Sequence, residues 1–148
     1  MRDIPRSALV LGLAGLLPFV WGVVTMHSPT AQSLTIDLIG PRFVGPFVIL
    51  QYGTVILAFM SGVLWGFATK ATGAVATSGY MLSVLPALWA FFFVGGGPVS
   101  AATYLIAGYI GLLALDFMFW RQGLAPPWWM HLRALLTLGV VACLASVL

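Results

Sequence analysis

Few side chains in this sequence can perform acid–base, nucleophilic or metal chemistry. The groups that can are three acids, two histidines and one cysteine: Asp3, Asp37, Asp116, His27, His131 and Cys143. General acid–base catalysis by two carboxylates, or binding of a metal ion, requires several such groups at one place. No two of the six lie within one helical turn of each other. The elements that carry them therefore decide whether any site can form.

The composition indicates that most of the chain lies in lipid. Of 148 residues, 61% are hydrophobic and only 6% are charged, and the mean hydropathy is +1.09. A soluble domain carries about a quarter of its residues as charged side chains. We therefore expect an all-α integral membrane protein. Its expected partners are membrane lipids and either other membrane-protein subunits or a second copy, and no nucleic acid.

Apolar segments long enough to cross a membrane predict a bundle of five transmembrane helices. A spanning helix needs about 20 mostly apolar residues. Pro18 and Pro86 fall inside two of the segments, where we expect kinks. The first segment is longer than the apolar region of a signal peptide, so we interpret it as a retained helix. A single transmembrane domain over 1–148 is expected, with spans at about 7–26, 46–69, 73–94, 99–120 and 128–148.

The positive-inside rule predicts a cytoplasmic N-terminus and a periplasmic C-terminus in a bacterial inner membrane. With that orientation Arg42 alone lies outside, in the long outer connection 27–44, where TIDLIG is expected to form a short interfacial helix. The inner side carries the other five cations: Arg2, Arg6, Lys70, Arg121 and Arg133.

The same orientation separates the reactive groups. Asp3 and Asp37 fall on opposite sides of the membrane, and so do His27 and His131. A single cysteine forms no internal disulfide. We therefore expect no catalytic residue, no metal and no cofactor. The hydroxyls in or near the spans are expected to bond their own helix backbone: Ser61, Ser83, Ser100, Thr103, Thr137 and Ser146.

Asp116 is the one acid inside a predicted span, and a charge there is costly and suggests a function. Helical rise places Asp116 about 26 Å, and Arg133 about 22 Å, from the outer ends of adjacent antiparallel spans. One interpretation is a structural ion pair, Asp116–Arg133, that locks the two helices together. The alternatives are a proton-relay or ion site, a contact with a partner, and an inner-surface cluster with Lys70 and Arg121.

Small residues recur every four positions in the second span, at Thr54, Ala58, Gly62 and Gly66. Small residues allow membrane helices to approach closely. The strip is therefore a helix-packing face inside this chain's own bundle, or a face for a second copy or another subunit. Basic and aromatic residues near the inner membrane surface are expected to anchor it there: Lys70, Trp120, Arg121, Trp128 and Trp129.

Three stretches resemble a known family: LGLAGLLPFVWG (11–22), YGTVILAFMSGVLWGFA (52–68) and PWWMHLRALLTLGVVACL (127–144), with SVLPALWAF (83–91) less closely. The family is a bacterial one of small multi-pass membrane proteins of unknown function that also includes mitochondrial transmembrane protein 69. Leu64 stands where that family usually has histidine, so a metal or proton role of such a histidine does not transfer. The resemblance implies a topology rather than an activity. The positions that match its pattern are Tyr52, Gly53, Gly62, Trp65, Gly66, Asp116 and Arg133.

Three functions remain open at this point. The leading hypothesis is a non-catalytic accessory or assembly subunit of a larger membrane complex, such as a respiratory or photosynthetic electron-transfer complex. The alternative is a small homo-oligomeric transporter or channel that uses Asp116 and a face formed by Tyr104 and Tyr109. The third is a membrane enzyme or lipid-handling protein, which requires a polar pocket that the sequence does not reveal.

Overall fold

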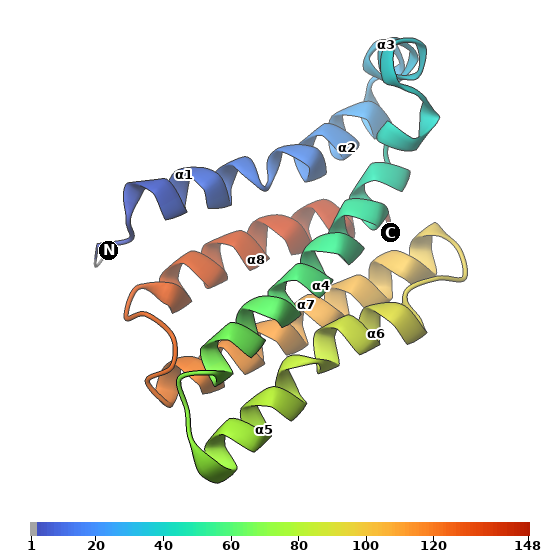
Figure 1. Cartoon of the computed structure of the whole chain (residues 1–148). Coiled ribbons are helices and arrows are strands. Elements are labelled where there is room, and N and C mark those ends of the chain that lie inside the picture. The colour runs from blue at the N-terminus through green and yellow to red at the C-terminus, as the bar shows by residue number, and fades with distance from the viewer. Residues whose placement is uncertain (1–2) are drawn as a thin grey trace.

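A computed structural model describes residues 3–148, and within that range the chain is helical and has no strand. This result confirms the predicted all-helical class. The elements, in chain order (Figure 1), are α1 (Arg6–Ala14), α2 (Leu17–His27), α3 (Pro29–Ile39), the 3₁₀ turn η1 (Pro41–Phe43), α4 (Phe47–Ala68), α5 (Gly73–Ser83), α6 (Leu85–Phe93), α7 (Pro98–Arg121) and α8 (Trp129–Ala145).

Four helical stretches are long and apolar enough to cross a membrane. They are α1 with α2 (Arg6–His27), α4, α5 with α6 (Gly73–Phe93), and α7. The last predicted span is the shorter apolar helix α8, with 17 residues, which corresponds to about 26 Å of helix. The hydrocarbon layer is about 30 Å thick. Within residues 3–148, four stretches thus have the length and composition of membrane spans, while the fifth crossing and the orientation remain predictions.

The two composite stretches are interrupted next to their prolines, as the sequence predicts. α1 ends at Ala14, and after two intervening residues α2 begins with Leu17 and Pro18; α5 ends at Ser83, and α6 begins with Leu85 and Pro86. Proline has no backbone N–H and its ring clashes with the preceding turn. At the second interruption, Ser61 of α4 accepts a hydrogen bond from the N–H of Ala87 at 2.8 Å.

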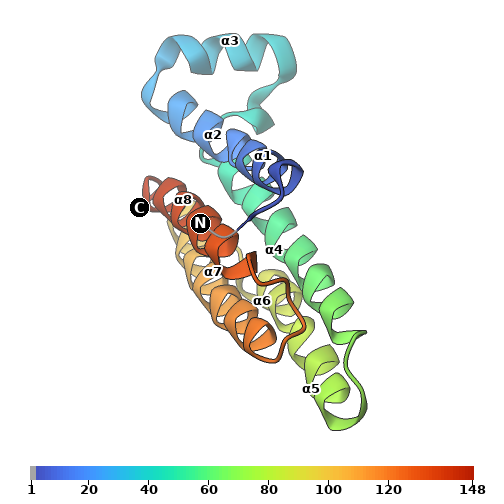
Figure 2. The same cartoon turned by 90° about the vertical axis from the view of Figure 1, so that its left-hand side faces the viewer.

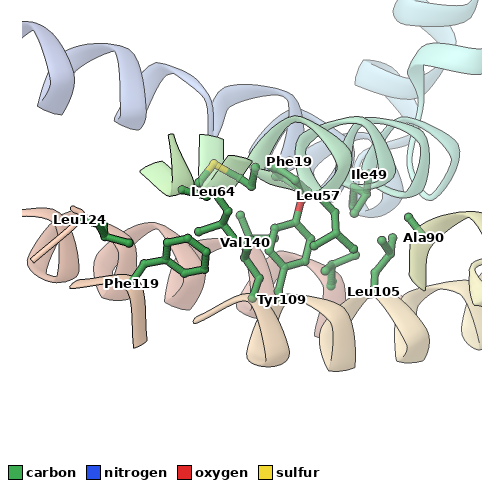
Figure 3. Close-up of a cluster of buried hydrophobic side chains, with 14 residues drawn as sticks. Phe19, Ile49, Leu57, Leu64, Ala90, Leu105, Tyr109, Phe119, Leu124 and Val140 are labelled. Atoms are coloured by element: carbon green, nitrogen blue, oxygen red, sulfur yellow. The ribbon is translucent and has the colours of Figure 1, made fainter. Parts of the chain in front are cut away.

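The helix α4 lies at the centre of the arrangement and packs against α2, α5, α6 and α7, while α7 and α8 form an antiparallel pair (Figure 1). Tyr109 of α7 lies in the middle of the buried apolar cluster (Figure 3). Its hydroxyl donates to the carbonyl oxygen of Gly53 at 2.7 Å. This buried bond links the two central helices, which carry most of the core.

Close backbone contact joins α2 to the start of α4. A Cβ at Gly22 would collide with the side chain of Ile49, and one at Gly45 would collide with the carbonyl of Gly22. Thr25 accepts a hydrogen bond from the N–H of Gly45 at 2.8 Å. In contrast, α1 contains no buried residue and packs against α8. The first span is therefore held tightly at its α2 end and loosely along α1.

The connection 27–44 is mostly helical. The helix expected within TIDLIG is the second half of α3, and Ser28 caps its start by accepting from the N–H of Ala31 at 3.3 Å. Figure 2 shows α3 lying across the end of the bundle. Its apolar residues Leu34, Leu38 and Ile39 are exposed, a pattern that suits a helix lying in a membrane surface.

Candidate functional site

Asp116 and Arg133 lie together in the interior of the bundle. Arg133 Nε donates to Asp116 Oδ2 at 2.8 Å, and Trp129 Nε1 donates to Asp116 Oδ1 at 2.9 Å. Asp116 is 0% exposed and Arg133 is 5% exposed. Each carboxylate oxygen thus has a donor, which is the arrangement a buried charge needs in a low-dielectric environment. The structure joins the two side chains that the sequence suggested as a pair.

The local fold explains how three side chains meet. Trp129 and Arg133 are four residues apart at the start of α8, so they project from the same face of that helix. Gly123 ends α7 with a φ of 75°, a left-handed conformation that glycine adopts without steric cost. The tight turn brings α8 back along α7, where Asp116 lies.

Trp129 was expected only as an interfacial anchor, and its bond to Asp116 was not anticipated. A buried indole N–H generally needs a hydrogen-bond partner. That rule, together with the four-residue spacing from Arg133, is the signal that points to the missing contact. The ring of Trp129 also packs edge-on against Phe67 of α4, with centroids 5.1 Å apart, so the polar centre is tied to a third helix.

Two buried polar atoms in this region lack a partner. Among residues 3–148, neither Arg133 Nη2 nor Thr137 Oγ1 has a hydrogen-bond partner. Most other helical threonines donate to a carbonyl of their own helix, which is what the sequence led us to expect for Thr137 as well. An unpaired buried donor costs about 1–3 kcal/mol. The two atoms belong to residues one turn apart on α8, next to the ion pair.

The small-residue strip of α4, formed by Thr54, Ala58, Gly62 and Gly66, does not pack inside the bundle. Ala58, Gly62 and Gly66 are exposed and Thr54 is half-buried. No atom of the described chain lies within 4 Å of a Cβ built on Gly62 or Gly66. The buried side of α4 is instead formed by larger residues, among them Leu57 and Leu64. Our first interpretation, packing against this chain's own helices, is therefore wrong.

The other predicted anchors gather where α4 meets α5 and where α7 meets α8. Lys70 Nζ donates to the carbonyl of Leu124 at 3.3 Å, and Trp120 Nε1 donates to that of Pro127 at 3.3 Å. Arg121 is exposed and Trp128 is half-buried. Within the described residues Asp116 pairs with neither Lys70 nor Arg121, so the predicted inner-surface cluster does not include the acid.

Other candidate residues do not form a site together. Tyr109 is 1% exposed whereas Tyr104 is 38% exposed, so the two tyrosines do not share a face. Within residues 3–148, no three His, Cys, Asp or Glu side chains gather closely enough to hold a metal. Arg2, counted among the inner cations, lies outside the described residues.

A hollow lies between α6 and α7, away from the polar centre. Its volume is about 520 Å³ and its lining is almost wholly apolar, with Gly108 and Gly111 leaving room on the α7 side. The indole N–H of Trp89, which also lines it, already donates to the carbonyl of Tyr104 at 2.7 Å. This hollow therefore offers space and apolar contact but no free polar group to fix a ligand.

Comparison with known proteins confirms the resemblance found in the sequence. The profile of the family described as "Protein of unknown function (DUF3429)" matches residues 4–148. The chain is 33% identical over 150 residues to transmembrane protein 69 of Xenopus tropicalis, covering 99% of this chain and 55% of that protein. The chain thus spans about half the length of this relative. No solved structure matches it. With its four apolar stretches of membrane-spanning length, the chain is a multi-pass membrane protein and belongs to the DUF3429 family.

Proposed function

We propose that the chain is a non-catalytic accessory or assembly subunit that packs against a larger membrane complex. It would lie in a bacterial inner membrane with five spans, a cytoplasmic N-terminus and a periplasmic C-terminus. The observation that carries the proposal is the outward direction of the α4 strip Thr54, Ala58, Gly62 and Gly66. A respiratory or photosynthetic electron-transfer complex is the class of partner to look for first.

The strip has the geometry that membrane helices use to associate. Without a hydrophobic driving force in lipid, helices associate where small residues let their backbones approach, as in the GxxxG pattern. Gly62 and Gly66 form that pattern, and a Cβ at either position meets no described atom within 4 Å. A neighbouring helix can therefore reach the backbone of α4 without rearrangement of this chain.

The rest of α4 is suited to present such a face. The helix is packed against α2, α5, α6 and α7, and Trp65, at the edge of the strip, lies against Tyr80 of α5 with ring centroids 4.6 Å apart. A partner that docks on the strip would therefore meet a helix already fixed in position. Preorganisation of this kind lowers the entropy lost on binding.

The test is extraction of the tagged chain from its native membrane in mild detergent, followed by a native gel and mass spectrometry. Wild type is expected to migrate with one larger complex in a fixed ratio. Gly62→Leu and Gly66→Leu should abolish that co-migration while the chain itself stays folded. Gly111→Leu is the matched control, because Gly111 is also an exposed helical glycine with open space around it.

Three outcomes would contradict the proposal. A large complex that survives both leucine substitutions would show that α4 is not the docking face. A small band that contains only copies of this chain would favour the alternative, a homo-oligomeric transporter or channel. Loss of the complex in the Gly111→Leu control alone would move the interface to the groove between α6 and α7.

A further inference from the structure

A second, smaller cavity lies beside the ion pair, between α1, α2, α4, α7 and α8. We call it the side cavity; its volume is about 220 Å³, and its lining includes Leu11, Phe19, Tyr52, Phe59, Arg133 and Thr137. An apolar cavity of about 150 Å³ is large enough to hold a benzene ring. The side cavity therefore has room for a substituted six-membered ring.

Two residues that line the side cavity carry the buried side-chain polar atoms for which residues 3–148 provide no partner. Arg133 and Thr137 both line it, each is 5% exposed, and Nη2 of the first and Oγ1 of the second have no partner among residues 3–148. A guanidinium N–H is only a donor, and a hydroxyl can donate. Two residues in the wall of the cavity thus each carry a donor that the described chain does not use.

The outer end of the cavity faces the surroundings of the bundle. Leu11 of α1 is 72% exposed and Phe59 of α4 is 64% exposed, although both line the cavity. On the α1 side the wall includes Gly12 and Gly15. Since α1 and α4 are membrane-spanning stretches by length and composition, this opening is directed at lipid. A ligand would enter sideways, from the membrane.

The charge of the site selects against an anion. The formal charges of Arg133 and Asp116 cancel, and their atoms are 2.8 Å apart. A carboxylate or phosphate would bring an unbalanced charge into a buried site next to Asp116, which is strongly unfavourable. A neutral carbonyl oxygen would accept both hydrogen bonds without adding charge. The aromatic residues Phe19, Tyr52 and Phe59 of the lining favour a flat ring beside it.

We propose that the side cavity binds a neutral, membrane-soluble molecule through a ring carbonyl oxygen that accepts hydrogen bonds from Arg133 and Thr137. The head group of an isoprenoid quinone has this chemistry. A neutral acyl lipid such as diacylglycerol shares the carbonyl oxygen but lacks the ring. The proposal concerns a ligand rather than a protein partner, so it does not depend on the α4 docking face.

The test uses the purified chain in detergent micelles. It is titrated with a benzoquinone bearing a short isoprenoid tail, with diacylglycerol, and with a fatty-acid anion, and is followed by thermal unfolding and native mass spectrometry. A ligand that binds only the folded state raises the melting temperature. The quinone is expected to do so, diacylglycerol less, and the anion not at all.

Thr137→Val separates a binding role of the hydroxyl from a structural one. A structural role predicts a lower melting temperature without ligand, whereas a binding role predicts weaker quinone binding at an unchanged or higher melting temperature. The substitution removes an unpaired buried hydroxyl, so the ligand-free variant should melt at the same temperature as wild type or higher. The same variant should bind the quinone about tenfold more weakly, the loss expected for one hydrogen bond. Thr103→Val is the control, because its exposed hydroxyl already donates to the carbonyl of Val99.

One possible result is that diacylglycerol binds more tightly than the quinone and that Thr137→Val weakens its binding. This result would support recognition of a carbonyl oxygen but overturn the proposal that the ligand carries a ring. Binding of the anion alone would overturn the proposal. Quinone binding of equal strength in wild type and Thr137→Val would also overturn the proposal. If none of the three compounds bound, the proposal would be overturned as well, and the cavity would hold only water.

Discussion

At the scale of single residues, the centre of the molecule is a balanced polar group in an apolar interior. Asp116 accepts from Arg133 and Trp129, at 2.8 and 2.9 Å, and all of its surface is buried. Such a pair contributes little net stability compared with apolar residues of the same size, but loss of one partner leaves the other buried and uncompensated. Substitution of Asp116 alone and substitution of both Asp116 and Arg133 should therefore differ sharply in their effect on the free energy of unfolding.

Asp116→Asn should destabilise the folded chain by about 3–5 kcal/mol, because it leaves the Arg133 guanidinium without a counter-charge. The double variant Asp116→Leu with Arg133→Met should recover most of that loss, since it removes both charges. The measurement is the free energy of unfolding in detergent for wild type and the two variants. If Asp116→Asn unfolded like wild type but transport of an ion were abolished, the structural interpretation of the pair would be wrong.

At the scale of elements, glycine has two opposite uses in this bundle. Gly22 on α2 allows contact between backbones, because any side chain there would meet Ile49 of α4. Gly62 on α4 faces open space. The same residue type thus brings helices together inside the chain at one position and leaves a bare surface at another.

Leu64, at the position where the family resemblance suggests histidine, belongs to the buried side of α4 and is 0% exposed.

Gly22→Val should lower the melting temperature of the isolated chain, because overpacking a tight contact costs about 1–3 kcal/mol or more. It should also disturb the hydrogen bond between Thr25 and Gly45. Gly62→Val introduces the same side chain into open space and should leave the melting temperature of the isolated chain nearly unchanged. Thermal unfolding of the two variants in the same detergent compares them directly. Equal decreases in melting temperature would show that other parts of the chain cover α4 at Gly62.

At the scale of the whole molecule, the distribution of cations orients the bundle. Figure 1 shows the start of α1 at the same end as the α4–α5 and α7–α8 connections. That end therefore carries Arg6, Lys70 and Arg121, while Arg42 lies at the other end, in η1. Arg133 is not counted among the cations at the membrane surface because it is buried in the ion pair. Among the described cations outside the core, three against one still favour a cytoplasmic N-terminus.

A topology reporter that is active only outside the cytoplasm should be active when fused after Leu148 and inactive when fused after Gln122. The reason is that α8, although only 17 residues long, is within a few ångströms of the hydrocarbon thickness, a mismatch that membranes accommodate by local thinning. An inactive Leu148 fusion would mean that α8 does not cross and that the chain has four spans.

Hydropathy, length and proline positions determined much of this protein from its sequence. They predicted the helical membrane class, four stretches of membrane-spanning length, the interruptions at Pro18 and Pro86, and the proximity of Asp116 and Arg133. These are local properties, or they follow from two helices joined by a short turn. Helical rise alone fixes the depth of a side chain in its span.

The rotation of each helix about its own axis was decided only by the tertiary structure. In lipid the outer and inner faces of a helix are both apolar, so no amphipathic pattern shows which face turns inward. For this reason the sequence left open the direction of the Gly62–Gly66 strip, and it revealed neither the role of Trp129 nor the unpaired hydroxyl of Thr137. The side cavity likewise could not be read from the sequence, because its lining comes from α1, α2, α4, α7 and α8, which are distant in the chain.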